Sequence, residues 1–297
     1  GYILHPKRQY RVIQNETIMQ GGLSKMRNLT RILFISFLSL SLIGTGAAFG
    51  ETIVIKGSTT VLPVAQATAE AFIAANPEIN ISISGGGSGN GIKALVDKST
   101  NIATASRFIK DKEVNLAHEN GVYAVPHRVA IDAIIPVVHP SNPVNDLTIE
   151  QLSLIYQGKI KNWNEVGGND MKIVVVSRDT SSGTYEVWEE KVLHKAKVTP
   201  RAQLQASNGA IVQAISKNKY AIGYIGLGYL NKDVKALKVN GIEASSQNAL
   251  SGAYPVARPL FMFTDGWPTG STAKFIVFVL SREGQEIVKK EGFVPLY

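Results

Sequence analysis

The residues best suited to do chemistry lie in four loops, each between a strand-like stretch and a helix-like one. The loops combine glycine with small hydroxyl or amide side chains, at residues 57–60 (GSTT), 85–91 (GGGSGNG), 177–184 (SRDTSSGT) and 207–209 (SNG). The first backbone N–H groups of a helix have no partner within the helix, and the helix dipole favours negative charge there. Glycine also lets the backbone approach a ligand closely. The pattern therefore predicts an anion site built from N–H and hydroxyl donors.

One of these loops also carries a permanent positive charge. Arg178 lies near the start of the third loop, and a planar guanidinium matches an oxyanion with two parallel hydrogen bonds. Ser, Thr and Asn directly before a helix are usually only N-caps, so any single loop is explained without a ligand. Four loops of one chemical type, one of them with Arg, favour joint anion binding over four separate caps.

Motifs and residue types that the chain lacks narrow the function further. There is no G-x-G-x-x-G in residues 85–91, no P-loop and no G-x-S-x-G nucleophile elbow. The sequence contains no cysteine, which excludes disulfides, thiolate metal sites and a cysteine nucleophile. The histidines form no H-E-x-x-H motif, so we expect neither a metal nor a cofactor. The five histidines are His5, His118, His127, His139 and His194.

The segments around the loops alternate between strand-like and helix-like patterns. Alternation of this kind predicts a parallel α/β sheet, in which ligands bind at the carboxyl ends of the strands, where these loops lie. A mature chain of about 245 residues suits two lobes better than one. The strand-like stretches are 52–55, 79–83, 129–138, 173–176, 221–225 and 259–263. The helix-like stretches are 62–73, 92–96, 149–156, 185–194, 210–217, 272–280 and 283–290.

Residues 26–50 are typical of a secretory signal peptide. Basic residues surround Met26, the apolar run 32–43 follows, and small residues lead to Gly50. We expect Met26 to be the native start, residues 1–25 to be an upstream segment that is not native, and cleavage to occur before Glu51. The alternative is an uncleaved N-terminal anchor, although the run is shorter than the roughly 20 residues of a membrane span. The expected location is the periplasm.

Composition and charge argue for a globular chain that does not bind nucleic acid. Hydrophobic residues are 44% and charged residues 18%, which is enough apolar material for a core. The formal charge is +8, but the first fifty residues contribute +5, so the rest carries only +3. So small an excess does not indicate a nucleic-acid-binding face.

Three ordered motifs resemble those of the phosphate-binding proteins of bacterial phosphate ABC transporters, the PstS family. They are residues 57–63 (GSTTVLP), residues 87–93 (GSGNGIK) and Arg178 followed by 182–184 (SGT). The resemblance spans most of residues 52–297 and implies an α/β, two-lobed periplasmic binding protein of type II. Two extended hinge crossovers are expected near 127–134 and 252–258, with the ligand in the interlobe cleft. We expect residues 51–130 and 256–297 to form lobe 1 and residues 131–255 to form lobe 2.

The resemblance also implies a set of binding residues and their roles. Thr59 would bind through its hydroxyl, Thr60 through its backbone N–H, Ser88 through its hydroxyl and Arg178 through its charge. Ser58, Arg107, Asp132 and Asn208 are further candidates. The full set of expected phosphate-binding residues is Thr59, Thr60, Ser88, Arg178, Ser182, Gly183 and Thr184.

One position departs from the family pattern. Long members carry an Asp after the second helix, which accepts the proton of hydrogen phosphate, and Arg107 stands in the matching place here. A carboxylate acceptor rejects sulfate, which has no proton to donate. Asp132 and Asp179 are candidate replacements, although Asp132 could instead be a solvated or hinge-bonding carboxylate. Arg107 either contacts the anion or lies on the surface.

The expected function is high-affinity phosphate binding as the solute receptor of an inner-membrane ABC permease, by a monomer that is not an enzyme. An anion that contacts both lobes would stabilise the closed form. One alternative is a receptor for another tetrahedral oxyanion, namely sulfate, tungstate or molybdate. A second is a secreted phosphatase-like hydrolase with Ser182 as nucleophile, although no base or metal cluster accompanies it. A third is a free-standing anion scavenger or adhesion protein of the same fold.

Overall fold

The structure is a computed structural model that describes residues 51–297. The expected upstream segment, residues 1–25, and the expected signal peptide, residues 26–50, lie outside the described residues. Between residues 51 and 297, no helix combines the length and the apolar character needed to cross a membrane.

Strands and helices alternate along most of the described chain. The strands are β1 Thr52–Gly57, β2 Asn80–Ser84, β3 Ile102–Ala105, β4 Ala124–Val138, β5 Asp146–Leu147, β6 Val174–Arg178, β7 Gln203–Gln205, β8 Ala221–Gly226, β9 Lys235–Ala236, β10 Lys238–Val239 and β11 Ala257–Asp265. The helices are α2 Leu62–Ala75, α3 Ser88–Val96, α4 Asp111–Glu119, α5 Ile149–Tyr156, α6 Gly183–Lys191, α7 Asn208–Ser216, α8 Ser246–Leu250, α9 Gly270–Leu280 and α10 Arg282–Lys290, with short 3-10 turns η1 Trp163–Val166 and η2 Leu227–Tyr229.

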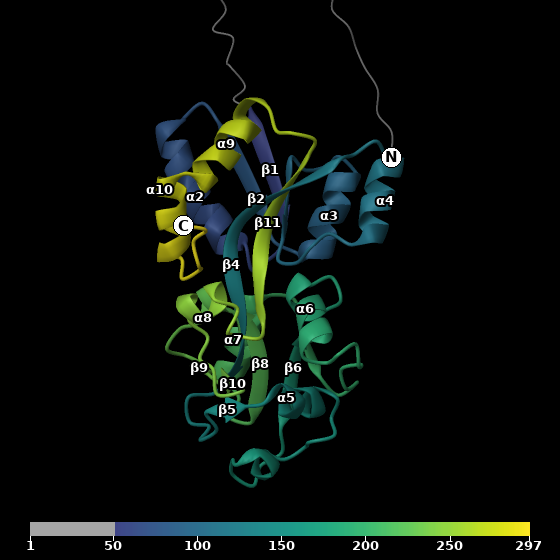
Figure 1. Ribbon diagram of the computed structural model, residues 1–297, viewed down its shortest axis with the longest axis vertical. Coiled ribbons are helices and arrows are strands. Elements are labelled where there is room, and N and C mark those ends of the chain that lie inside the picture. Colours follow the sequence, from purple (N-terminus) through teal and green to yellow (C-terminus); the bar gives the residue numbers. More distant parts are fainter. Residues whose placement is uncertain (1–50) are drawn as a thin grey trace, which may run out of the picture. The chain divides into compact units, whose positions relative to one another are not determined.

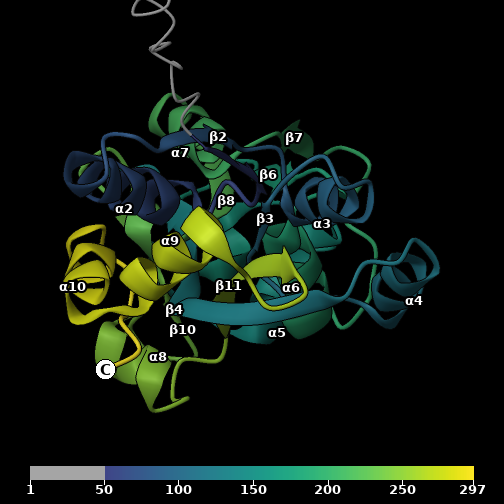
Figure 2. The ribbon, with the colours of Figure 1, turned by 90° about the horizontal axis from the view of Figure 1, so that it is seen from above.

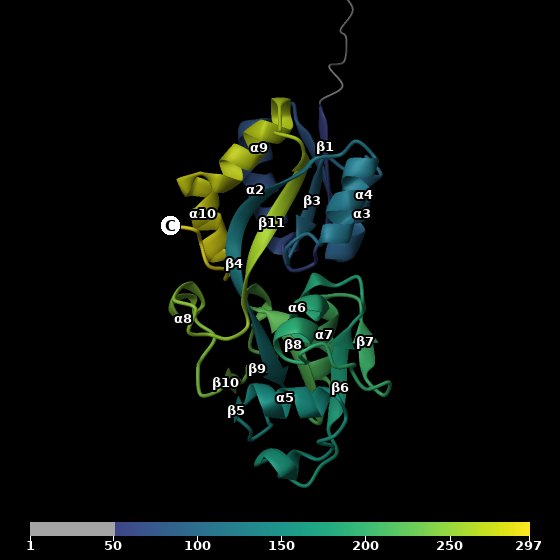
Figure 3. The same ribbon diagram turned by 45° about the vertical axis from the view of Figure 1, so that its right-hand side comes forward.

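Residues 51–297 form two α/β lobes that share two long strands. Lobe 1 contains β1–β3, α2–α4, α9 and α10, and lobe 2 contains β5–β10 and α5–α8 (Figures 1 and 3). β4 and β11 lie side by side and pass between the lobes, as Figure 1 shows. The expected crossover near 127–134 lies within β4, and the one near 252–258 leads into β11. The lobe boundaries at residues 130 and 256 stay a prediction.

The strand directions correct the expectation of a parallel sheet. The strand order is β2-β1-β3-β11-β4-β8-β6-β7, and the outer pairs, such as β1 with β2 and β6 with β8, are parallel. At the centre, however, β11 is antiparallel to β3 and β4, and β4 is antiparallel to β8. The reason is that β4 carries the chain into lobe 2 and β11 brings it back, so the two strands run in opposite senses. Neither strand belongs to a simple strand-helix-strand unit.

Helices cover both faces of the sheet in lobe 1. Along β11, Leu260 and Met262 belong to the hydrophobic cluster under α2, α9 and α10, whereas Phe261 and Phe263 belong to the cluster under α3 and α4. Successive side chains of a strand point to opposite faces, which explains this alternation. Seen from above, α2, α9 and α10 lie on one side and α3 and α4 on the other (Figure 2).

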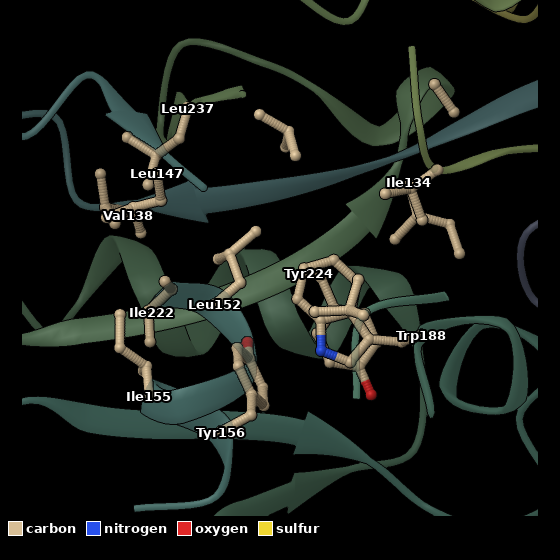
Figure 4. Close-up of a cluster of buried hydrophobic side chains, with 14 of the residues drawn as sticks. Ile134, Val138, Leu147, Leu152, Ile155, Tyr156, Trp188, Ile222, Tyr224 and Leu237 are labelled. Carbon is tan, nitrogen blue, oxygen red and sulfur yellow. The ribbon is translucent and has the colours of Figure 1, made fainter. Parts of the chain in front are cut away.

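The core of lobe 2 fixes the segment that carries Arg178. Trp188 of α6 stacks on Tyr224 of β8, with ring centroids 4.4 Å apart and an angle of 9° between the planes (Figure 4). The Tyr224 hydroxyl lies 2.9 Å from Ser177 Oγ and accepts a hydrogen bond from the Arg178 N–H at 3.2 Å. The same packed aromatic pair therefore anchors both α6 and the end of β6.

Several helices begin earlier than the apolar pattern predicts. α3 starts at Ser88 rather than residue 92, α6 at Gly183 rather than 185, and α7 at Asn208 rather than 210. The first turn of each is polar or glycine-rich, so hydrophobic periodicity does not detect it. The consequence is that the predicted loop residues are first-turn residues, whose N–H groups lack partners within the helix. The pattern also missed β3 and the largely polar helix α4.

Candidate anion-binding site

The predicted site residues lie at strand ends and helix starts of both lobes. β1 ends at Gly57 and β6 at Arg178, while α3, α6 and α7 begin at the predicted loops. These side chains are almost fully buried although nearly all are polar, which requires hydrogen-bond partners for them. Their exposed fractions are Ser58 3%, Thr59 7%, Thr60 1%, Ser88 0%, Arg178 1%, Ser182 1%, Thr184 1% and Asn208 0%.

Hydrogen bonds connect the predicted residues of lobe 1 to those of lobe 2. Asn208 Nδ2 donates to Thr59 Oγ1 at 3.1 Å and to Thr60 Oγ1 at 3.0 Å. Thr60 Oγ1 in turn lies 3.0 Å from Thr184 Oγ1. The Thr60 N–H, which the resemblance assigns to the anion, donates to Ser58 Oγ at 3.1 Å. Thr60 thus joins the site through its hydroxyl rather than its backbone.

Two glycines let the lobes approach at this point. A Cβ atom on Gly183 would lie 2.3 Å from Ser88 Oγ, and one on Gly87 would lie 2.6 Å from the Ser181 carbonyl. Gly87 also has a φ of +102°, which side chains other than glycine rarely adopt. The Gly89 N–H donates to the Ser181 carbonyl at 3.0 Å. The structure therefore shows the lobes in contact, in a closed arrangement.

Arg178 is a buried cation without a carboxylate partner among the described residues. Its Nε donates to the Gln205 carbonyl at 3.0 Å and its Nη2 to the Ala206 carbonyl at 3.1 Å. Nη1 is buried and has no hydrogen-bond partner within residues 51–297. Burial lowers the pKa of Arg178, but a guanidinium stays charged in proteins. A buried donor of this kind is costly unless an acceptor, best a negative one, occupies the place it faces.

Both candidate carboxylates already accept hydrogen bonds from the protein. Asp132 Oδ2 accepts from Arg258 Nε at 3.0 Å and Nη2 at 2.8 Å, and its Oδ1 accepts from the Leu227 N–H at 2.8 Å. Burial raises the pKa of Asp132, and Arg258 acts against that shift. Asp179 Oδ1 accepts from the Ser181 N–H at 2.9 Å and from the Ser181 hydroxyl. Both carboxylates therefore stabilise the protein around the site.

Arg107 neither lies on the surface nor joins the hydroxyl network. It is 5% exposed and forms two 2.8 Å hydrogen bonds with the carboxylate of Glu113 on α4. On its other side it pairs with Glu186 of α6, across the lobes. Lys110 Nζ also donates to Glu186 Oε1, at 2.7 Å. Charged residues of lobe 1 thus hold one carboxylate of lobe 2, and sequence reasoning had singled out neither glutamate.

We predict that Glu186→Gln weakens anion binding moderately, by about fivefold, because partly buried pairs of this kind contribute roughly 1 kcal/mol. The pairs of Arg107 and Lys110 with Glu186 form only when the lobes meet, so their loss destabilises the closed form alone. Calorimetric titration with phosphate measures the effect. Glu190→Gln, an exposed position on the same helix, is the control, and equal affinities for the two variants would contradict the prediction.

Two residues of the site, buried Arg258 and half-buried Tyr229, escaped sequence reasoning. Arg258 of β11 is 4% exposed and donates through Nη2 to Thr60 Oγ1 at 3.2 Å and Thr184 Oγ1 at 3.0 Å. The Tyr229 hydroxyl donates to the Thr59 carbonyl, and burial raises the pKa of Tyr229 to about 12, so it keeps its proton. The one sequence feature that could have indicated Arg258 is its position as a charged residue directly before the apolar stretch 259–263.

The remaining chemistry of the site is limited. Ser182, the nucleophile of the hydrolase alternative, accepts a hydrogen bond from the Tyr185 N–H at 3.2 Å as the N-cap of α6. Within residues 51–297, no group of three or more His, Asp or Glu side chains is arranged to hold a metal ion. The arrangement offers donors and one unpaired positive charge, which suits reversible binding of an anion.

Comparison with known proteins gives the family. The model of the PBP superfamily domain matches residues 44–283. The phosphate-binding protein PstS of Bacillus subtilis is 32% identical over 250 residues, which cover 82% of this chain and 81% of that protein. The chain belongs to the PstS family of the PBP superfamily. The PstS protein of Pseudomonas aeruginosa is likewise 32% identical, with 81% of each chain covered.

Solved structures of phosphate-binding proteins also match this chain in their fold. A structure from Clostridium perfringens, described as a phosphate ABC transporter substrate-binding protein with bound phosphate, is 40% identical. It has a TM-score of 0.79, with 83% of this chain and 100% of that chain covered. An ABC-type phosphate transport receptor from Vibrio cholerae is 32% identical with a TM-score of 0.68, covering 82% of this chain and 99% of that one. The expected two-lobed α/β fold is confirmed.

Proposed function

We propose that this protein is the extracytoplasmic solute receptor of an ABC importer, that phosphate is its ligand, and that it binds rather than converts that ligand. Membership of the PstS family and similarity to a protein solved with bound phosphate support the proposal. We further propose that the signal peptide, residues 26–50, is removed on export. The mature protein would be a monomer in the periplasm that docks on an inner-membrane permease. The residues proposed to bind phosphate are Thr59, Ser88, Arg178, Ser182, Gly183 and Thr184, with Ser58, Thr60 and Asn208 in support, because the N–H and hydroxyl of Thr60 are engaged within the protein.

The observation that carries the proposal is the unsatisfied Nη1 of buried Arg178. Asp132 neutralises the charge of Arg258. Among residues 51–297, the positive charge of Arg178 therefore remains without a compensating carboxylate beside the hydroxyl network. Helices α3, α6 and α7 add the positive ends of their dipoles. Burying a divalent anion costs several kcal/mol, and only a dense set of fixed donors offsets that cost. Five or more charge-assisted hydrogen bonds of about 1.5–3 kcal/mol each are sufficient for sub-micromolar affinity after ordering costs.

The division of the donors between the lobes supplies the mechanism. Thr59 and Ser88 come from lobe 1, whereas Arg178 and the first turn of α6 come from lobe 2. In an open form each lobe would present half a site. An anion that binds both halves favours the closed form by its differential affinity, and the hinge at β4 and β11 closes. The permease would then distinguish the loaded receptor by its closed shape.

Titration calorimetry with phosphate, sulfate, tungstate and molybdate in turn tests the ligand. We expect phosphate to bind with sub-micromolar affinity and the other anions to bind more weakly. One observation favours the oxyanion alternative, namely that Asp132 and Asp179 are both engaged within the protein. Sulfate binding as tight as phosphate would therefore establish a general tetrahedral-anion receptor. Absence of binding by all four anions would refute the proposal.

We predict that millimolar phosphate raises the melting temperature of the protein. A ligand that binds only the folded state stabilises it by mass action, by about 4 kcal/mol at a thousand times its dissociation constant. Differential scanning fluorimetry measures the shift, with chloride at equal ionic strength as the control. The same shift in both salts would indicate a general salt effect and contradict specific binding.

A further inference from the structure

Arg258 lies where the two shared strands and both lobes meet. It is on β11 and pairs with Asp132 of β4, and both side chains are almost completely buried. Its Nη1 donates to the Ser106 carbonyl at 3.0 Å, and its Nη2 reaches the hydroxyls of Thr60 and Thr184. Thr60 belongs to lobe 1 and Thr184 to lobe 2, so a single guanidinium contacts the anion-site hydroxyls of both lobes.

The donors around Thr60 have fixed directions. Asn208 Oδ1 accepts from the Gly226 N–H at 3.0 Å, which assigns the amide orientation and leaves Nδ2 to face the threonines. The two Nδ2 hydrogens go to Thr59 Oγ1 and Thr60 Oγ1. One Nη2 hydrogen of Arg258 goes to Asp132 Oδ2, 2.8 Å away. The other Nη2 hydrogen points between Thr60 Oγ1 and Thr184 Oγ1, which lie 3.2 Å and 3.0 Å from Nη2, and the two hydroxyl oxygens share it.

These donors favour one direction for the hydroxyl hydrogens. Thr60 Oγ1 accepts from Asn208 and shares the Arg258 hydrogen, so two donors already face its lone pairs. Of the two possible directions of its 3.0 Å hydrogen bond with Thr184 Oγ1, we therefore assign Thr60 as the donor. Thr184 Oγ1 then accepts from Thr60 and from Arg258, so its own hydrogen has no acceptor within this network. That hydrogen is left for a ligand oxygen.

We propose that Arg258 is a positioning residue that fixes the Thr184 hydroxyl as a hydrogen-bond donor to the bound anion. The inference rests on the proposed function, because it assigns a role within the same site. Arg258 does so only when Thr60 and Thr184 are both within reach, that is, when the lobes are closed. The ion pair between Arg258 of β11 and Asp132 of β4 thereby couples closure of the lobes to completion of the set of hydrogen-bond donors that face the anion.

Arg258→Lys tests the proposal, because it keeps the positive charge beside Asp132 but removes the planar fork. We expect at least about tenfold weaker phosphate binding by calorimetry. In a Thr184→Val background, where no hydroxyl remains to be oriented, the same change should weaken binding by less than about threefold, so the two effects are coupled. Arg128→Lys, at an exposed position on β4, is the matched control and should bind phosphate normally in both backgrounds.

The outcomes separate this inference from the proposed function. If the unaltered protein does not bind phosphate, the proposed function fails. If the unaltered protein binds phosphate and Arg258→Lys binds it equally well, the inference is wrong. It is also wrong if Arg258→Lys lowers the phosphate affinity as much in the Thr184→Val background as in the otherwise unaltered protein. A lower melting temperature with unchanged affinity also overturns it, since the role is then structural. Should Arg258→Lys not fold, the double variant Asp132→Asn with Arg258→Met, which removes both charges, takes its place under the same criteria.

Discussion

Replacing Arg178 by alanine is expected to weaken phosphate binding by about 2 kcal/mol or more, roughly thirtyfold, because a desolvated charge pair would lose one partner. Arg178 is 1% exposed and is the buried cation of the site without a carboxylate among residues 51–297. The same substitution removes donors to the carbonyls of Gln205 and Ala206. Calorimetric titration of the purified variant with phosphate measures the affinity.

The control for this prediction is Arg201→Ala, because Arg201 is an exposed arginine of the same lobe. It removes the same charge from the protein without touching the site, so its affinity should match that of the unaltered chain. If both variants lose affinity equally, the effect comes from overall charge rather than from contact with the anion. Unchanged affinity in Arg178→Ala would remove this residue from the site.

Replacing Gly183 by alanine is the second change with a large expected effect, because the new methyl group blocks closure. Its Cβ would lie 2.3 Å from Ser88 Oγ and 2.9 Å from Ser106 Oγ. Ser88 cannot easily move aside, since its Oγ accepts a hydrogen bond from the Ser106 N–H at 3.0 Å. Overpacking of this kind costs about 1–3 kcal/mol, and we expect a loss of phosphate affinity near the upper end. In an open form the lobes would be apart, so the methyl group would not meet Ser88.

The melting temperature distinguishes blocked closure from misfolding. Alanine is the better helix former, so ligand-free Gly183→Ala should melt no earlier than the unaltered protein. Gly209→Ala is the matched control, because it also lies in the first turn of a lobe 2 helix but meets only Ser207 Oγ, at 3.9 Å. It should bind phosphate normally. A Gly183→Ala variant that binds as tightly as this control would show that the lobes do not close as described.

The local features of the site could be predicted from the sequence. Glycine-rich and hydroxyl-rich loops mark helix starts because their preferences act within a few residues. The stretch 57–60 does precede a helix, and the stretches 85–91, 177–184 and 207–209 run into the first turn of one. The resemblance to the PstS family and the two-lobed fold are confirmed by the comparisons. The binding roles of the individual residues stay predictions until affinities are measured.

What escaped prediction depends on residues that are distant in the chain. Arg258 meets Asp132 and Thr60 only because β11 returns beside β4. Glu186 meets Arg107 and Lys110 only because α6 lies opposite the start of α4 when the lobes touch. Charges in such pairs look like ordinary surface charges in the sequence, since nothing in their neighbours records the partner.

The sequence alone determined which donors this protein offers an anion, because a helix start, a glycine turn and an arginine keep their chemistry wherever they are placed. Only the tertiary structure decided how those donors are used. Within the part of the chain that the structure describes, burial left one guanidinium nitrogen without a partner, both candidate carboxylates accept hydrogen bonds from the protein, and a second arginine lies between the lobes. The physical reason is that hydrogen-bond satisfaction is a property of three-dimensional neighbours, and these are set by how the strands cross rather than by local sequence.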